Sequence, residues 1–153
     1  CQISEFINTV DNIVGIRIVP LLDKDIKTYL KKRCPFNHVT VMMKKSDVIK
    51  SGNYLDWFWN EDYYLWIRMM LAGCKFKNLN DILVNVRVGN DMYRRRGGKK
   101  YFQSEIRLQK YMLDNHIIGV VTYCCNVFIR LIIQILLPNK IRGIIFQKLF
   151  RNK

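Results

Sequence analysis

The order of hydrophobic and polar positions predicts a unit of alternating strands and helices, followed by a region of helices alone. Runs rich in Val, Ile and other apolar residues predict strands at 12–20, 38–43, 74–79 and 82–88. Apolar residues at helical spacing, with acids in front or glycine and bases behind, predict helices at 23–33, 45–54, 61–73 and 100–113. This order is typical of an α/β sheet unit, here residues 1–98, with a helical C-terminal extension, here residues 99–153.

A long apolar segment at 117–137 ends at Pro138. Its polar members, spaced four apart, are Thr122, Asn126, Arg130 and Gln134. On an α-helix this spacing forms one narrow polar stripe. The segment has the ~20 residues that a bilayer span needs, but Arg130 near the centre of a span would cost ~2.5–3.5 kcal/mol. We therefore expect a helix that lies on a membrane or packs on the domain.

The net charge of +14 predicts a partner that carries negative charge, such as nucleic acid, anionic lipid or a phosphorylated small molecule. The last acidic residue is Asp114, and the bases beyond it alternate with Ile, Leu and Phe. The segment 139–153 is predicted to be a basic amphipathic helix, which favours a membrane surface over nucleic acid. Five cysteines without CxxC spacing indicate a reducing compartment, without a disulfide framework or a zinc site.

Two adjacent carboxylates, Glu61 and Asp62, open the helix predicted at 61–73. Acids in the first turn stabilise a helix through its dipole by ~0.3–1 kcal/mol, so the pair needs no other role. The second hypothesis is that the pair holds a general base. An aromatic loop that ends in Trp59 precedes it, and Trp66 lies close to the same helical face as Asp62. Aromatic side chains beside a carboxylate are a common sugar-binding arrangement.

The segment 87–100 is basic and contains glycines. It is either a solvated charge run or a lid that closes over a diphosphate, because guanidinium groups match phosphate oxygens and glycine lets backbone amides approach. The candidate residues of this lid are Arg87, Arg94, Arg95, Arg96, Gly97 and Gly98.

Two further polar positions have alternative interpretations. His38, at the mouth of a predicted strand, is either a structural residue or part of a substrate site. Asp23 and Asp25 form a DxD run, the signature of metal–diphosphate sites. Because this run begins a predicted helix and no apolar strand leads into it, we interpret it as helix capping.

Three segments, in this order, resemble the C-terminal half of a bacterial family 2 glycosyltransferase of the capsule, exopolysaccharide and O-antigen type. They are KKRCPFNHVTVMMKKSDVIKSGNY, NEDYYLWIRMMLAG and ILVNVRVGNDMYRRRGGKKYFQSEIRLQKYML. The resemblance implies a GT-A fold and an inverting transfer from a nucleotide-diphospho-sugar. It implies that Asp62 is the catalytic base, with Glu61 beside it. The substrate-binding residues that we expect are Trp66, His38, Trp59, Arg87, Arg94, Arg95, Arg96, Gly97 and Gly98.

The same resemblance places the nucleotide-binding strand and the metal-binding DxD of the family upstream of Cys1. The chain is then the acceptor-side half of the fold, and we expect it to be inactive alone. The divalent metal, Mn²⁺ or Mg²⁺, belongs to the full-length enzyme, so we expect no metal ligand here. The acceptor is expected to be lipid-linked or another glycan, at the cytoplasmic face of the bacterial inner membrane, where the protein binds the anionic surface peripherally.

The alternative is a basic membrane-surface module without chemistry of its own, which predicts that Glu61 and Asp62 lie far from any pocket. The enzyme hypothesis predicts instead that Asp62, Trp66 and the loop 94–98 converge on one cleft.

Overall fold

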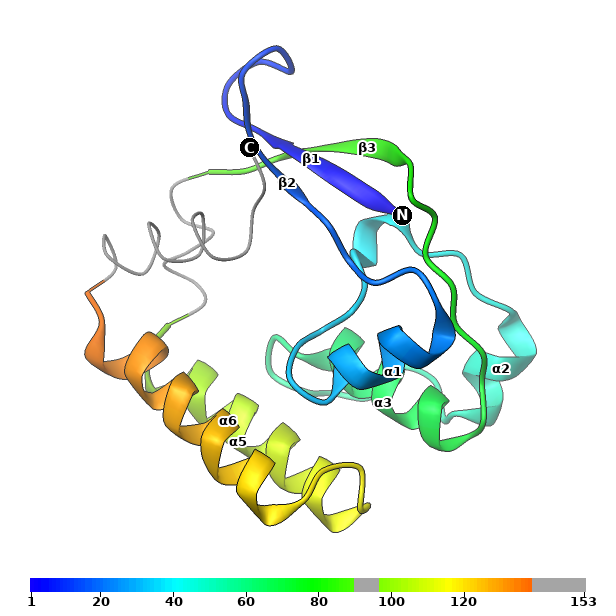
Figure 1. Ribbon diagram of the computed structural model, residues 1–153, viewed down its shortest axis with the longest axis vertical. Helices are drawn as coiled ribbons and strands as arrows, with labels where there is room; N and C mark the ends of the chain where they lie inside the picture. Colours follow the sequence, from blue (N-terminus) through cyan, green and yellow to red (C-terminus); the bar gives the residue numbers. More distant parts are fainter. Residues whose placement is uncertain (90–96, 139–153) are drawn as a thin grey trace.

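The computed structural model describes residues 1–89 and 97–138. Its strands are β1 (Gln2–Phe6), β2 (Ile13–Arg17) and β3 (Ile82–Arg87), and they form one sheet in the order β2-β1-β3. The central strand β1 runs antiparallel to β2 and parallel to β3, as Figure 1 shows. The described part is thus a small mixed α/β fold.

The central strand was not predicted, because its polar residues conceal it. All five residues of β1 are buried, including Gln2, Ser4 and Glu5. The Gln2 side chain replaces solvent with backbone partners: its amide nitrogen donates to the carbonyl oxygens of Val19 and Leu79, each at 3.1 Å. A buried polar group that is fully hydrogen-bonded is tolerated in a core, which is why a polar sequence can form the middle of this sheet.

Three helices lie beside the sheet: α1 (Asp23–Leu30), α2 (Lys45–Lys50) and α3 (Glu61–Leu71). Ile26 and Leu30 of α1 and Leu65 and Ile67 of α3 are completely buried in one core. Leu108, from the next helix along the chain, joins the same core. The strongly apolar middle of α3 therefore becomes the centre of the molecule, and its acidic first turn is held at the edge of that core.

Two further helices, α5 (Lys99–Asp114) and α6 (Val120–Leu131), pack side by side, and α6 continues into a π-helical turn at Ile132–Leu136 (Figure 1). The polar stripe of α6 faces inward. Asn126 Nδ2 donates to Gln109 Oε1 at 2.8 Å and to the Lys31 carbonyl at 2.9 Å. Within the described ranges, none of the helices combines the length and the apolar character required to cross a bilayer.

The predicted strands at 12–20 and 82–88 and all four predicted helices are confirmed, but two predicted strands are wrong. At 38–43 the chain forms a 3₁₀ turn, His38–Thr40, because both the N–H and the hydroxyl of Thr40 donate to the Asn37 carbonyl, each at 2.8 Å. At 74–79 the chain is fixed by side chains instead of a strand ladder: Asn78 Nδ2 donates to the carbonyl oxygens of Pro20 and Pro35. The division at residue 98 stays a prediction.

Candidate functional site

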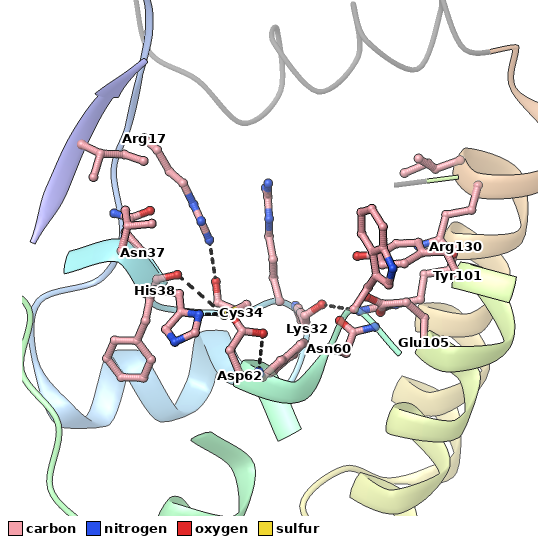
Figure 2. A pocket seen from close by; sticks show the side chains of 18 of the residues that line it. Arg17, Lys32, Cys34, Asn37, His38, Asn60, Asp62, Tyr101, Glu105 and Arg130 are labelled. Atoms are coloured by element: carbon pink, nitrogen blue, oxygen red, sulfur yellow. Dashed lines mark hydrogen bonds and ion pairs between the residues drawn. The ribbon is translucent and has the colours of Figure 1, made fainter. Parts of the chain in front are cut away.

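A pocket of about 440 Å³ lies between the sheet, the segment 32–39, the start of α3 and the α5–α6 pair (Figure 2). Its charged lining consists of Arg17, Lys32, Arg33, Arg130, Glu5, Asp62 and Glu105. Its other polar and aromatic lining includes Cys34, Asn37, His38, Trp59, Asn60, Tyr63, Tyr101 and Gln134, and its apolar lining includes Ile3, Phe36, Val39, Val86, Ile129 and Ile133. A concave site with apolar walls and a few converging polar groups is typical of small-molecule binding.

Asp62 reaches the pocket from the first turn of α3. Asn60, the residue before the helix, makes no side-chain cap; its amide instead donates to Ser104 Oγ at 3.1 Å and ties the helix start to α5. The Asp62 carboxylate accepts the backbone N–H of Tyr63 at 2.6 Å, and its other oxygen lies 3.8 Å from His38 Nδ1. The side chain is 24% exposed, so the carboxylate is accessible from the pocket but mostly removed from water.

Burial raises the pKa of Asp62 above its ordinary value. The hydrogen bond from the Tyr63 N–H, the nearby His38 imidazole and the Arg17 guanidinium oppose this effect, and Glu61 adds to it. Since desolvation outweighs the favourable partners, Asp62 holds a proton more readily than a surface aspartate does. A carboxylate of this kind is a better proton acceptor than an exposed one.

His38 and Tyr54 form an aromatic wall next to Asp62. His38 Nε2 lies 2.9 Å from the Tyr54 hydroxyl, and the two rings are stacked with centroids 5.8 Å apart. The rings of Trp66 and His38 meet edge to face, with their centroids 6.1 Å apart. Trp66 itself is only 2% exposed and packs against Phe36 in the core. Trp66 therefore packs against His38 from the core side. It is not part of the pocket lining, where the sequence had placed it.

Glu105 and Arg130 form the opposite wall of the pocket, on the α5–α6 side in Figure 2. Arg130 Nε donates to Glu105, and Arg130 Nη2 donates to the Lys32 carbonyl at 2.9 Å. Their side chains are 12% and 8% exposed. This buried ion pair connects α5, α6 and the segment after α1, so it fixes the width of the pocket.

Sequence reasoning missed Arg17 and Asn37. Arg17 Nη2 donates to the Cys34 carbonyl at 3.0 Å at the pocket wall (Figure 2). The signal was its position as the one base within an apolar strand run. Asn37 is 2% exposed; its Nδ2 donates to the Cys1 carbonyl at 2.7 Å, and its Oδ1 has no hydrogen-bond partner among the described residues.

The structure brings only some of the predicted site residues together. Asp62, His38 and Trp59 line the pocket. The exposed Glu61 does not, although it adjoins Asp62.

The predicted lid residues lie apart from this group or outside the described residues. Arg87 lies over the Phe6 ring at 5.7 Å, outside the pocket lining. Gly98 donates its N–H to the carbonyl of the pocket residue Gln134 at 3.0 Å, with Gly97 next to it. Arg94, Arg95 and Arg96 lie outside the described residues. The described C-terminal end of the loop, Gly97 and Gly98, therefore lies next to the pocket wall.

Among the residues that the structure describes, the acidic run Asp23–Asp25 and the other possible ligands do not form a metal cluster. Within 1–89 and 97–138, no group of three or more His, Cys, Asp and Glu side chains is placed to hold an ion. In the DxD run, Asp23 Oδ2 pairs with Lys27 at 2.8 Å and its Oδ1 accepts the N–H of Phe76 at 2.8 Å. The bond from Lys27 is the main cause that lowers the pKa of Asp23. Asp23 is thus an acid in the first turn of α1, which agrees with the predicted helix start, but it makes no side-chain cap bond to the helix, so the interpretation as a cap is wrong.

Comparisons with known proteins identify bacterial relatives. The chain is 49% identical over 109 residues to an uncharacterized glycosyltransferase of Haemophilus influenzae, covering 71% of this chain and 40% of the relative. It is 35% identical over 136 residues to the UDP-Gal:alpha-D-GlcNAc-diphosphoundecaprenol beta-1,3-galactosyltransferase of Escherichia coli, covering 89% and 49%. It is 34% identical over 133 residues to the amylovoran biosynthesis glycosyltransferase AmsE of Erwinia amylovora, covering 87% and 50%.

The chain is therefore homologous to bacterial glycosyltransferases of polysaccharide biosynthesis, and it spans about half the length, or less, of these relatives. No family model and no solved structure matches it.

Proposed function

We propose that this chain is the acceptor-side part of an inverting family 2 glycosyltransferase with a GT-A fold. The enzyme transfers a sugar from a nucleotide-diphospho-sugar to a lipid-linked glycan during synthesis of a bacterial surface polysaccharide. The observation that carries the proposal is the position of Asp62, a partly buried carboxylate in a pocket, in a chain homologous to such enzymes. A surface module without chemistry predicts Glu61 and Asp62 far from any pocket, and Asp62 lies in one.

Asp62 is the general base of this proposal. The acceptor hydroxyl is a poor nucleophile, and a carboxylate within about 2.6–3.2 Å removes its proton as the new glycosidic bond forms. The raised pKa of Asp62 suits this task, because it moves the affinity of the base for the proton closer to what neutral conditions require. Help of this kind contributes ~10²–10⁴-fold to the rate. Glu61 is exposed, and its negative charge adds to the rise in the pKa of Asp62. In this proposal it does not contact the acceptor.

The cations of the pocket receive the leaving group. A nucleoside diphosphate gains negative charge as it departs, and fixed guanidinium and ammonium groups stabilise that charge. Arg17, Lys32 and Arg33 line the same pocket as Asp62 and supply these positive charges. In this proposal Arg94, Arg95 and Arg96, together with Gly97, Gly98 and Arg87, close over the same diphosphate. A divalent metal, Mn²⁺ or Mg²⁺, would stabilise negative charge on the diphosphate when bound to the full-length enzyme, and no step described here depends on it.

The acceptor side faces α6. The name of one relative specifies a GlcNAc-diphosphoundecaprenol acceptor, and we propose an acceptor of that class, a sugar diphosphate on a polyprenyl lipid. Trp59 offers a ring to the sugar, and Ile129 and Ile133 give the pocket an apolar wall on the side of α6.

α6 also provides a membrane-facing surface. Apolar residues point outward from α6 and from the π-helical turn that continues it: Val121 and Phe128 of α6 are 78% and 62% exposed, and Leu136 of the turn is 65% exposed. We propose that this face lies on the cytoplasmic surface of the inner membrane, so that the protein is peripheral and meets its lipid-linked acceptor there.

The proposal is tested with the protein expressed from the complete coding sequence that contains this chain. Deleting that sequence from its host should leave a lipid-linked glycan that lacks one sugar. This glycan, extracted from the deletion strain, should accept label from one member of a panel of nucleotide-sugars when the purified protein is added with Mn²⁺ or Mg²⁺. Identical lipid-linked glycans in the deletion and parent strains would contradict the proposal.

A further inference from the structure

Three side chains from three separate segments form a row that begins at the pocket with Asp62 and His38 and ends outside its lining with Tyr54. Asp62 begins α3, His38 lies in the 3₁₀ turn, and Tyr54 follows α2. His38 Nδ1 faces the Asp62 carboxylate at 3.8 Å, and His38 Nε2 faces the Tyr54 hydroxyl at 2.9 Å. The imidazole therefore has one ring nitrogen toward the proposed base and the other toward a hydroxyl.

Packing fixes the His38 ring in this orientation. Tyr54 stacks on the imidazole with an interplanar angle of 29°, and Trp66 meets it edge-on at 80°. Trp66 is buried and cannot move away easily. An exposed histidine held by a face, an edge and a hydroxyl has few rotamers left, so the direction of its Nδ1 is set before any substrate binds.

The three side chains also lead from the pocket to water. The Asp62 side chain is 24% exposed, the His38 side chain 43% and Tyr54 42%. Because 3.8 Å is longer than a direct hydrogen bond, a proton that leaves Asp62 along this row would reach His38 Nδ1 through one bridging water.

We propose that His38 is a positioning residue for Asp62, anchored by Tyr54, and that it carries away the proton taken from the acceptor. This inference rests on the proposed function. In the transfer step the acceptor O–H bond breaks and its electron pair forms the bond to the anomeric carbon. The anomeric carbon–phosphate oxygen bond breaks, and its electron pair leaves with the nucleoside diphosphate. The proton arrives on Asp62 and passes through one bridging water to His38 Nδ1, and the imidazolium then releases its Nε2 proton to water on the side of Tyr54.

The charged groups around Asp62 determine how a substitution of His38 changes the pKa of Asp62. Arg17 of β2 acts on the carboxylate through its charge while its guanidinium donates to the Cys34 carbonyl; Glu61 adjoins Asp62 on the same helix, and Tyr54, from the loop after α2, lies beyond the histidine. Glu105 and Arg130, on the far wall, neutralise each other. A positive His38 lowers the pKa of Asp62. Removing the imidazole therefore raises that pKa, and Asp62 becomes protonated at a higher pH.

The experiment measures single-turnover transfer by the full-length protein across pH, using the donor and acceptor found as described above. His38→Gln should slow transfer by up to about a hundredfold, the scale of a misplacement of roughly 1 Å at a reacting group. It should also move the acid limb of the pH profile to higher pH, which a merely structural role would not do. Tyr54→Phe removes only the hydroxyl beside His38 Nε2 and keeps both the stacked ring and the imidazole. It should therefore slow transfer less and leave the acid limb in place.

His116→Gln is the matched control, because His116 lies in the exposed turn between α5 and α6, away from the pocket. It should behave as wild type. If His38→Gln has wild-type rates and an unshifted acid limb while Asp62→Asn is inactive, this inference is overturned and the proposed base stands. If Asp62→Asn itself transfers normally, the proposed base fails as well. Should His38→Gln lower the yield of folded protein, Tyr54→Phe decides: a wild-type rate overturns the inference.

Discussion

Glu61 and Asp62 carry the same functional group on consecutive residues, yet only Asp62 lines the pocket. Successive residues on a helix point about 100° apart, so one side chain faces His38 and the other faces solvent. The sequence alone could predict that an acidic pair opens a helix but could not say which member turns inward. The resemblance to glycosyltransferases selected Asp62, and the geometry of the pocket is consistent with that choice.

The raised pKa of Asp62 predicts that this residue costs stability at neutral pH. A carboxyl whose folded-state pKa lies above its unfolded-state value contributes stability at low pH, and that stability is lost as pH rises through the folded-state pKa. Asp62→Asn keeps an oxygen for the Tyr63 N–H and removes the buried charge. Thermal unfolding should therefore show a free energy of unfolding at pH 7 that is equal to or higher than that of wild type, with no such advantage near pH 3.

Glu61→Gln is the matched control for this measurement. It removes an exposed acid from the first turn and should lower stability at pH 7 by the ~0.3–1 kcal/mol of a helix-dipole interaction. A loss of stability in Asp62→Asn that is as large at pH 3 as at pH 7 would contradict the account of Asp62.

The α5–α6 pair shows how a helix with an apolar sequence can present its polar stripe to the protein. Asn126 and Arg130 of α6 make hydrogen bonds to α5 and to the segment after α1. The sequence predicted the stripe, because the spacing of four is visible. It could not predict which side the stripe faces, because the buried partners Gln109 and Glu105 lie on another helix.

Breaking the pair between Arg130 and Glu105 should destabilise the attachment of α6. Arg130→Gln leaves Glu105 as a buried charge without its cation, which typically costs ~3–5 kcal/mol. Replacing both, as Arg130→Met with Glu105→Gln, should cost much less, because no unpaired charge remains. Urea unfolding of the full-length protein measures this difference. Equal losses in the single and double variants would show that the ion pair does not hold the helix.

The outward face of α6 should bind an anionic bilayer. Phe128→Asn places an amide on that face, and losing burial of one large apolar side chain, worth ~1.5–3 kcal/mol, should weaken binding about tenfold or more. Flotation of the full-length protein with vesicles of phosphatidylethanolamine and phosphatidylglycerol measures this binding. Leu71→Asn, at the exposed end of α3, is the matched control and should float as wild type. Equal flotation of Phe128→Asn and wild type would exclude this face as the contact.

At the scale of the whole molecule, the helices and two strands were predictable because their periodicity is local. The central strand β1 was not, since it contains buried polar residues, and two of them, Gln2 and Ser4, are satisfied by partners distant in sequence. The pocket has the same character. Arg17, Asn37 and Glu105 meet only because the sheet, the 32–39 segment and α5 surround one space. Trp66 shows a different limit. Its spacing predicted that it lies close to the helical face of Asp62, but spacing alone does not distinguish a residue of the pocket wall from a residue of the core beneath that wall.

The most direct test of the central claim compares Asp62→Asn with Glu61→Gln in the full-length protein. Both variants remove one carboxylate, on adjacent residues of the same helix, and both are expected to fold. With the donor identified, sugar transfer to the lipid-linked acceptor should fall by ~10²–10⁴-fold in Asp62→Asn and should stay within a few-fold of wild type in Glu61→Gln. Transfer by a folded Asp62→Asn protein at the wild-type rate would contradict the assignment of Asp62 as the base.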